Sequence, residues 1–277
     1  MNRIAIACLV PLAIATAAAR AQEAPHVYAL VSAIGSKLQY VKPRMTTGTH
    51  LESMQRAELQ VPDTTLDMAA LRGLEHVVKG NDPQAKVEYL RINPDELKDI
   101  DPPKRGEAAV GKLATALEKM PGRDKWYQII LVAPRYVANE HNGMGSKLNG
   151  IGVFIQTLER SKIDMTDGTS GLFDSYETVT PEGEKVDTTS TAFVAPFFYA
   201  QVWVIDPHTL QVIQTTDRFE VQRIFDPKTA GTRVELSVPP EKLGPIVETF
   251  VEKSAEKAAA AAIGVVTVGD PRVVKPN

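Results

Sequence analysis

Apolar residues recur at helical spacing in three stretches of the chain. The first can be capped by Asp63 or Thr64 and ended by Gly80, and its apolar stripe consists of Leu66, Ala70, Leu71, Leu74, Val77 and Val78. The second runs from about Gly106 to Met120 and stops at a Pro-Gly step. The third lies within Pro240 to Ala262. The pattern predicts three amphipathic helices.

Apolar residues and turn signals also predict strands in the first third of the chain. Residues 26–34 (HVYALVSAI) and 37–41 flank a Gly-Ser step, so we expect them to pair as an antiparallel hairpin. Residues 43–62 are polar and favour an exposed segment, with a short helix at 51–59. Residues 86–92 (KVEYLRI) predict a further strand after a turn.

The most apolar predicted strands lie in the second half of the chain. Residues 127–133 (YQIILVA) are almost wholly apolar, which is typical of a strand covered on both faces, and we expect them at the centre of the sheet. Residues 153–158 predict another strand. Residues 191–205 and 210–225, joined by a tight turn, predict a long β-hairpin.

The order of these elements indicates the fold class. Helices lie between strands early in the chain, and antiparallel hairpins dominate later. This order favours an α/β fold of the α+β type: a two-layer sandwich in which a mixed sheet carries helices mainly on one face. Residues 161–190 are rich in Asp, Gly, Thr, Ser and Glu, and they predict the longest irregular segment.

The turn of the long hairpin carries a family resemblance. Residues 204–213 (VIDPHTLQVI) place an Asp-x-x-Thr turn between two strands. In this they resemble bacterial envelope α/β domains of the kind found in curli-secretion lipoproteins, penicillin-binding-protein activator lipoproteins and the amino-terminal domain of the Tol translocation protein. Those domains commonly have a Thr-Gly step where this chain has Thr209-Leu210. The resemblance concerns the fold, and it implies no functional residue.

The first 21 residues predict a cleaved signal peptide. Met1-Asn2-Arg3 is a short positive start, an apolar run follows, and Ala19-Arg20-Ala21 offers small residues at the two positions that a signal peptidase reads. The mature protein would then begin near Gln22 and work in the periplasm or outside the cell. We expect residues 22–277 to form a single α/β domain, because 256 residues suffice for an ordinary core.

Composition argues against several classes of function. Cys8 is the only cysteine and lies in the predicted leader, so the mature chain would form neither disulfides nor thiolate zinc sites. Without Arg3 and Arg20 the chain has 29 basic and 34 acidic residues, and Lys and Arg never form a run of four. We therefore expect no nucleic-acid partner. The apolar run of the leader is too short to span a bilayer, and no later segment approaches the roughly 20 apolar residues that spanning requires.

Glu140 and His141 are the candidate catalytic residues. They lie in a loop shortly after the apolar strand that ends near Val132, and the carboxyl ends of strands are where open α/β sheets bind ligands. A carboxylate and an imidazole can act as general bases or metal ligands, but no ligand spacing accompanies them. A solvent-exposed loop explains the same residues. We expect no cofactor and no bound metal.

Phe197, Tyr199 and Trp203 are the candidate binding residues. In a regular strand these odd-numbered side chains share one face. Sheet core is the ordinary interpretation of such a run. If helices cover only one face of the sheet, however, the aromatic side chains would form an exposed apolar strip that binds a partner.

Two hypotheses of different classes describe the function. The first is a non-catalytic periplasmic protein that binds another envelope protein or a cell-wall component. The second is a periplasmic hydrolase with a metal or a general base near Glu140 and His141. The first is favoured because the sequence completes no catalytic motif. A carrier of small ligands, with residues 161–190 as a lid, is a third hypothesis.

Overall fold

The computed structural model describes residues 24–43, 54–137, 148–156, 177–187, 193–229 and 240–264. The predicted leader, Glu140, His141 and most of the predicted irregular segment 161–190 lie outside these ranges.

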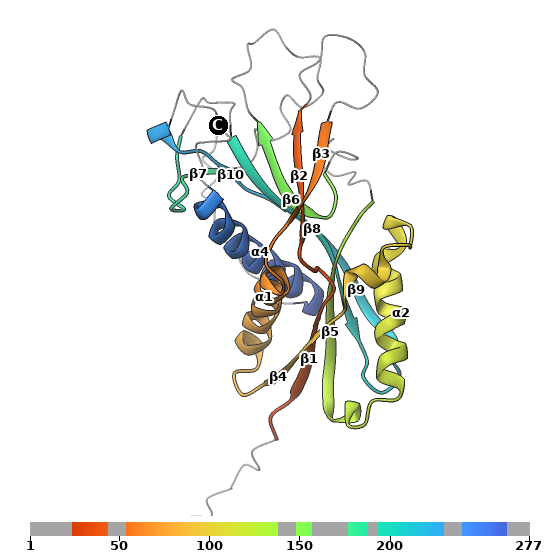
Figure 1. Ribbon diagram of the computed structural model, residues 1–277. Coiled ribbons are helices and arrows are strands. Elements are labelled where there is room, and N and C mark those ends of the chain that lie inside the picture. The colour runs from red at the N-terminus through yellow and green to blue at the C-terminus, as the bar shows by residue number, and fades with distance from the viewer. Residues whose placement is uncertain are drawn as a thin grey trace, which may run out of the picture.

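Ten strands in the described residues join into one mixed sheet (Figure 1). The strands are β1 (Val27–Ser32), β2 (Lys37–Pro43), β3 (Met54–Gln60), β4 (Lys86–Arg91), β5 (Trp126–Pro134), β6 (Ile151–Gln156), β7 (Thr178–Val179), β8 (Phe193–Ile205), β9 (Val212–Val221) and β10 (Arg223–Ile224). The α-helices are α1 (Thr65–Asn81), α2 (Arg105–Glu118) and α4 (Pro240–Ile263). Short 3-10 turns occupy Pro94–Leu97, Pro102–Lys104, Arg123–Lys125 and Pro227–Thr229. The predicted α/β class with a mixed sheet is confirmed.

Strand β8 is the central strand of the sheet. Its first half, residues 193–198, pairs with β6, and its second half, residues 200–205, pairs with β5. Because β9 pairs with residues 197–205 of β8, β5 and β6 must share the other side of β8. The sheet therefore divides on that side into a β5 branch, formed by β5, β1 and β4, and a β6 branch, formed by β6, β2 and β3 (Figure 1).

The predicted hairpin of residues 26–34 and 37–41 is wrong. Strand β1 pairs in parallel with β4 and β5, whereas β2 pairs with β3 and β6, in the other branch. The chain continues from β1 into β2 through a kink at Gly35, which has a φ of 81°. An apolar pattern shows that a segment is a strand, but it does not say which strand it pairs with.

The predicted short helix at 51–59 is also wrong, because residues 54–60 form strand β3. This strand pairs antiparallel with β2 along its whole length, from Lys37 opposite Gln60 to Pro43 opposite Met54. Pairing with a neighbouring strand thus overrides the weak helical preference of the segment. The expected helices, the strand at 86–92 and the long β8–β9 hairpin are confirmed, within a few residues at each end. Residues 177–187 of the expected irregular segment include the short strand β7.

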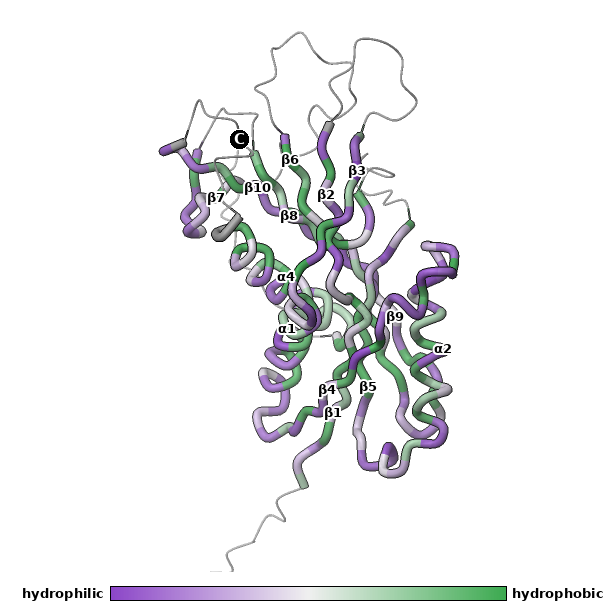
Figure 2. The backbone as a smooth tube through the Cα atoms, in the orientation of Figure 1, coloured by the Kyte–Doolittle hydropathy of each residue, from purple (hydrophilic) through white to green (hydrophobic). Residues whose placement is uncertain are grey.

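Helices cover both faces of the sheet, so the expected two layers become three in part of the molecule. Helices α1 and α4 pack on one face, across both branches. Helix α2 packs on the opposite face, over β1, β5 and the end of β8 (Figures 1 and 2). A separate apolar core lies in the β6 branch, and it contains Val41, Met54, Leu148, Phe154, Phe193, Ala195, Phe197 and Val221.

Helices α1 and α4 cross at Gly73. A Cβ atom on Gly73 would lie 2.2 Å from the carbonyl oxygen of Glu252 and 2.8 Å from the backbone nitrogen of Glu256. Beside this contact Arg72 donates hydrogen bonds of 2.7 Å to Glu248 and to Glu252. The absence of a side chain at Gly73 thus lets the two helix backbones come into contact. The hydrogen bonds of Arg72 stabilise this contact from the side.

Candidate functional site

The two branches of the sheet meet at a discontinuity that we call the sheet break. It comprises residues 33–36, which join β1 to β2, and the ends of β5 and β6 at Arg135 and Gly150. The Tyr199 carbonyl accepts from the Arg135 N–H at 2.9 Å, and the Tyr199 N–H donates to Gly150 at 2.7 Å. The Gly150 N–H donates to Arg135 at 2.7 Å and closes the set. The carboxyl ends of β1, β4 and β5 all point to this place, where an α/β sheet binds ligands most often.

A buried polar cluster lies at the carboxyl ends of β1 and β4. Asp67 and Ser32 are both fully buried, and the Ser32 hydroxyl donates to Asp67 Oδ1 at 2.6 Å. The same oxygen accepts from the Gly35 N–H at 3.0 Å. The other carboxylate oxygen, Oδ2, accepts from Arg91 Nε at 2.9 Å. Asp67 lies in the first turn of α1. Its hydrogen bonds therefore join this turn to β1, to the kink after β1 and to β4.

The predicted side-chain cap of α1 is absent, and the Asp67 cluster takes its place. Thr64 occupies the cap position with a left-handed φ of 71°, and its side chain makes no capping hydrogen bond. This conformation is unfavourable for a β-branched residue, by roughly 1–2 kcal/mol. Asp67 lies in the first turn, where the helix dipole favours a negative charge. The helix start is thus positioned by contacts with the sheet.

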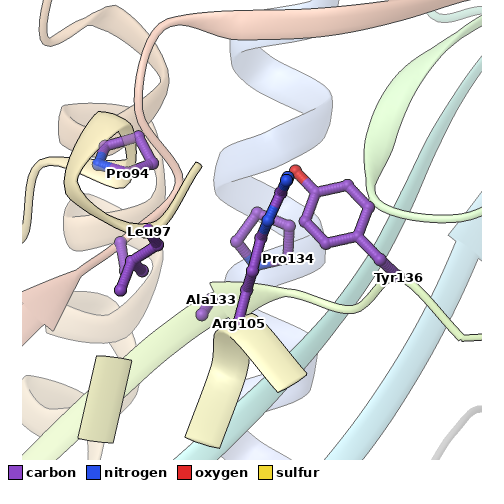
Figure 3. Close-up of a pocket in the computed structure, with 7 residues that line it drawn as sticks. Pro94, Leu97, Arg105, Ala133, Pro134 and Tyr136 are labelled. Carbon is purple, nitrogen blue, oxygen red and sulfur yellow. The ribbon is translucent and has the colours of Figure 1, made fainter. Parts of the chain in front are cut away.

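A small cavity opens on the α2 side of the sheet break. It measures about 30 Å³, which is room for about one water molecule, and it is lined by Ala33, Pro94, Leu97, Arg105, Ala133, Pro134 and Tyr136. Figure 3 shows Arg105 and Tyr136 side by side, and the guanidinium carbon lies 5.5 Å from the centre of the phenol ring. The ring also sits against Gly150, where a Cβ atom would come within 2.6 Å of it.

The cavity offers hydrogen-bond donors but no catalytic pair. Arg105 donates to the carbonyls of Ile100 at 3.0 Å and Lys98 at 2.9 Å, so two of its nitrogens already have partners. Burial raises the pKa of the Tyr136 phenol, so this group stays protonated at neutral pH. Ser32 and Asp67 are fully buried and do not line the cavity. The backbone hydrogen bonds among Arg135, Gly150 and Tyr199 join the two branches at the sheet break.

The candidate binding residues Phe197, Tyr199 and Trp203 do not form an exposed strip. They are 0%, 6% and 4% exposed. Trp203 lies beneath α2, where a Cβ atom on Gly106 would be 2.6 Å from its ring, and Phe197 belongs to the core of the β6 branch. The exposed strip required a sheet with helices on one face only. Helix α2 covers the second face at Trp203, so this side chain is buried. The core interpretation of these residues holds.

The candidate catalytic residues Glu140 and His141 lie outside the described residues, so the hydrolase hypothesis stays a prediction. Within the described ranges, no group of three or more His, Cys, Asp or Glu side chains is arranged to hold a metal ion. In the same ranges no helix has the length and apolar character needed to cross a membrane.

The turn between β8 and β9 is held by the Asp206 carboxylate. It accepts from the backbone N–H groups of His208 at 2.7 Å and Thr209 at 3.0 Å. Hydrogen bonds from these two backbone groups, Thr209 first, lower the pKa of Asp206. Leu210 adopts a left-handed φ of 56°. It thus has the backbone conformation that glycine takes easily, at the position where the resembling envelope domains commonly have glycine.

Strand β9 is an open edge of the described sheet, and it belongs to the hairpin predicted from the sequence. It pairs with β8 on one side, and no strand in the described residues pairs with its other side. Residues 212–215 are exposed, and Val212 and Ile213 keep 44% and 60% of their side-chain surface in solvent. The signal in the sequence was the uncharged run VIQTT directly after the hairpin turn.

Charges distinguish this edge from the edge strands β3 and β4. Edge strand β3 carries Arg56 and Glu58, and edge strand β4 carries Lys86, Glu88 and Arg91. Charged side chains on an edge strand hinder the addition of any strand that does not place opposite charges opposite them. Residues 212–216 of β9 carry none. The first half of β9 is therefore the least charged of these edges, and a β-bulge at Ile213 shifts its register with β8.

Comparisons with known proteins leave the family open. No family model matches the chain, and no curated protein matches it. One similar solved structure is a protein named as a homolog of the neuraminyllactose-binding hemagglutinin, from Helicobacter pylori. It shares 7% identity over 84% of this chain and 81% of its own, with a TM-score of 0.32. A TM-score this low supports no inference about fold or function. The resemblance of the hairpin turn to envelope domains stays a prediction.

Proposed function

We propose that the protein is an exported, non-catalytic binding protein of the cell envelope that pairs an extended segment of another envelope protein with strand β9. The observation that carries the proposal is the edge at residues 212–216, which is uncharged throughout and exposed at residues 212–215. Strand addition obtains affinity from backbone hydrogen bonds and selectivity from alternate side chains. Val212 and Ile213 are the exposed apolar side chains on this edge.

The predicted leader supports the location. Export would place the β9 edge among envelope proteins. If the leader is cleaved as predicted, amino-terminal sequencing of protein from an envelope extract returns a chain that begins near Gln22. Native molecules that are found in the cytosol with Met1 attached would contradict export, and they would leave the binding edge itself untouched.

Site-specific photocrosslinking tests the binding edge. We expect a photoreactive phenylalanine derivative in place of Ile213 to give an adduct of discrete mass in cells of the native host. The matched control is the same replacement at Tyr127, which is 52% exposed on β5, a strand separated from β9 by β8. An adduct of equal yield at Tyr127, or none at Ile213 in the exported protein, contradicts the proposal.

A charge placed on the edge provides the second arm of the test. We expect Gln214→Lys to abolish the adduct at Ile213, because a lysine on the edge opposes strand addition. Gln214 is exposed, so the melting temperature is expected to stay that of the parent protein. If the adduct persists at full yield in this variant, binding does not use the strand edge.

A further inference from the structure

Strand β3 forms a second open edge, at the end of the β6 branch. Residues 55–60 of this strand are all exposed, and Met54 is buried. Strand β2 pairs with one side of β3, and no strand in the described residues pairs with the other side. Arg56 and Glu58 lie two residues apart, so they project from the same face of the strand.

Symmetry limits how two copies of this edge could pair. If a two-fold axis perpendicular to the sheet relates two antiparallel β3 strands, each face of the sheet continues into the same face of the second copy. Residues that lie opposite each other point to the same face, so their numbers must add to an even total. In each such register one residue lies opposite its own copy, and the two-fold axis passes between the two. This central residue can be Arg56, Ala57 or Glu58, or a residue nearer to one end of the strand.

The charges select one of these registers. Centring on Arg56 or on Glu58 places two like charges directly opposite each other, which is unfavourable. Centring on Ala57 places Arg56 opposite Glu58 of the second copy, and Glu58 opposite Arg56. The same register pairs all seven residues of the strand, from Met54 opposite Gln60 onwards.

We propose that β3 is a self-association edge, at which two copies of the chain pair antiparallel with Ala57 opposite Ala57. The two sheets then join into one continuous sheet across the dimer. Within its own chain, Arg56 donates to Gln39 Oε1 through Nη1 at 3.3 Å. An interface made by one seven-residue strand is small, so the dimer dissociates on dilution.

Charge exchange tests the register. In sedimentation equilibrium at low salt and over a range of protein concentrations, we expect the parent protein to dimerise. Arg56→Glu and Glu58→Arg, made singly, each place like charges opposite each other twice and weaken the dimer about tenfold or more. The double variant R56E/E58R restores the opposite pairs and is expected to regain the parent association constant.

The double variant also controls for folding, because it contains both substitutions. A monomer at every concentration overturns the proposal. So do single variants that associate as well as the parent, or a double variant that stays as weak as the singles. None of these results affects the β9 crosslink, so the two proposals succeed or fail separately.

A disulfide test reports the same register directly. In a chain that carries Cys8→Ala to remove its only natural cysteine, Ala57→Cys is expected to form a disulfide-linked dimer on mild oxidation. Residue 57 lies opposite itself in the proposed dimer, and Ala57 is exposed in the monomer. The control is Lys86→Cys on edge strand β4, which is also exposed. Equal yields of linked dimer from the two variants overturn the proposal.

Discussion

Asp67→Ala is expected to lower the free energy of unfolding by about 3 kcal/mol, because it removes the side chain that joins Ser32, the Gly35 backbone and Arg91. The Ser32 hydroxyl and the Gly35 N–H would be left buried without their acceptor. For a chain of this size the melting temperature should fall by about 6–12 °C. Thermal unfolding followed by circular dichroism measures both quantities.

Two further variants separate the contributions to this loss. Asp67→Asn keeps an oxygen acceptor but loses the charge that faces Arg91, so we expect a smaller effect than that of Asp67→Ala. Asp95→Ala removes an exposed carboxylate that pairs with Lys37 at 3.2 Å, and it should cost less than about 1 kcal/mol. A loss of stability in Asp67→Ala no larger than in Asp95→Ala would show that the cluster does not hold the sheet break.

Gly73→Ala should destabilise the protein by about 3 kcal/mol, at the upper end of what overpacking usually costs. The added methyl group would lie 2.2 Å from the Glu252 carbonyl oxygen, and this neighbour is helix backbone, which cannot rotate away. Helix α4 must then move off α1, and this strains the hydrogen bonds of Arg72 to Glu248 and Glu252. Urea unfolding at fixed temperature measures the change.

Gly111→Ala is the matched control for this substitution. Gly111 lies in the exposed middle of α2, and nothing lies within 4 Å of an added Cβ atom there. Since alanine favours a helix over glycine, this variant should gain about 0.5–1 kcal/mol. If both glycine variants change the unfolding free energy in the same direction, the contact between α1 and α4 is not as close as the structure has it.

The sequence alone identified the helices and the long hairpin for a local reason. A helix that packs on a sheet must present an apolar stripe at a period of 3.6 residues, and Leu66, Leu71 and Leu74 show that stripe without knowledge of the rest of the chain. The hairpin between β8 and β9 was recognisable because Asp206 and Thr209 form a turn between two adjacent strands.

The site could be predicted only in part, because its residues are far apart in the sequence. Ser32, Asp67 and Arg91 come from two strands and a helix, and nothing in their local sequence links them. The burial of Trp203 depends on α2, which comes about 90 residues earlier in the chain. The open edges at β3 and β9 are likewise a property of strand order.

Local periodicity and turn chemistry thus determined which segments of this protein are helices and which are most of its strands. Only the tertiary structure decided that β1 and β2 lie in different branches, that residues 54–60 extend beside β2, and that α2 closes the second face. The physical reason is that a strand's own sequence specifies an apolar face, whereas its hydrogen-bonding partner is chosen by the competition of all strands for the same edges.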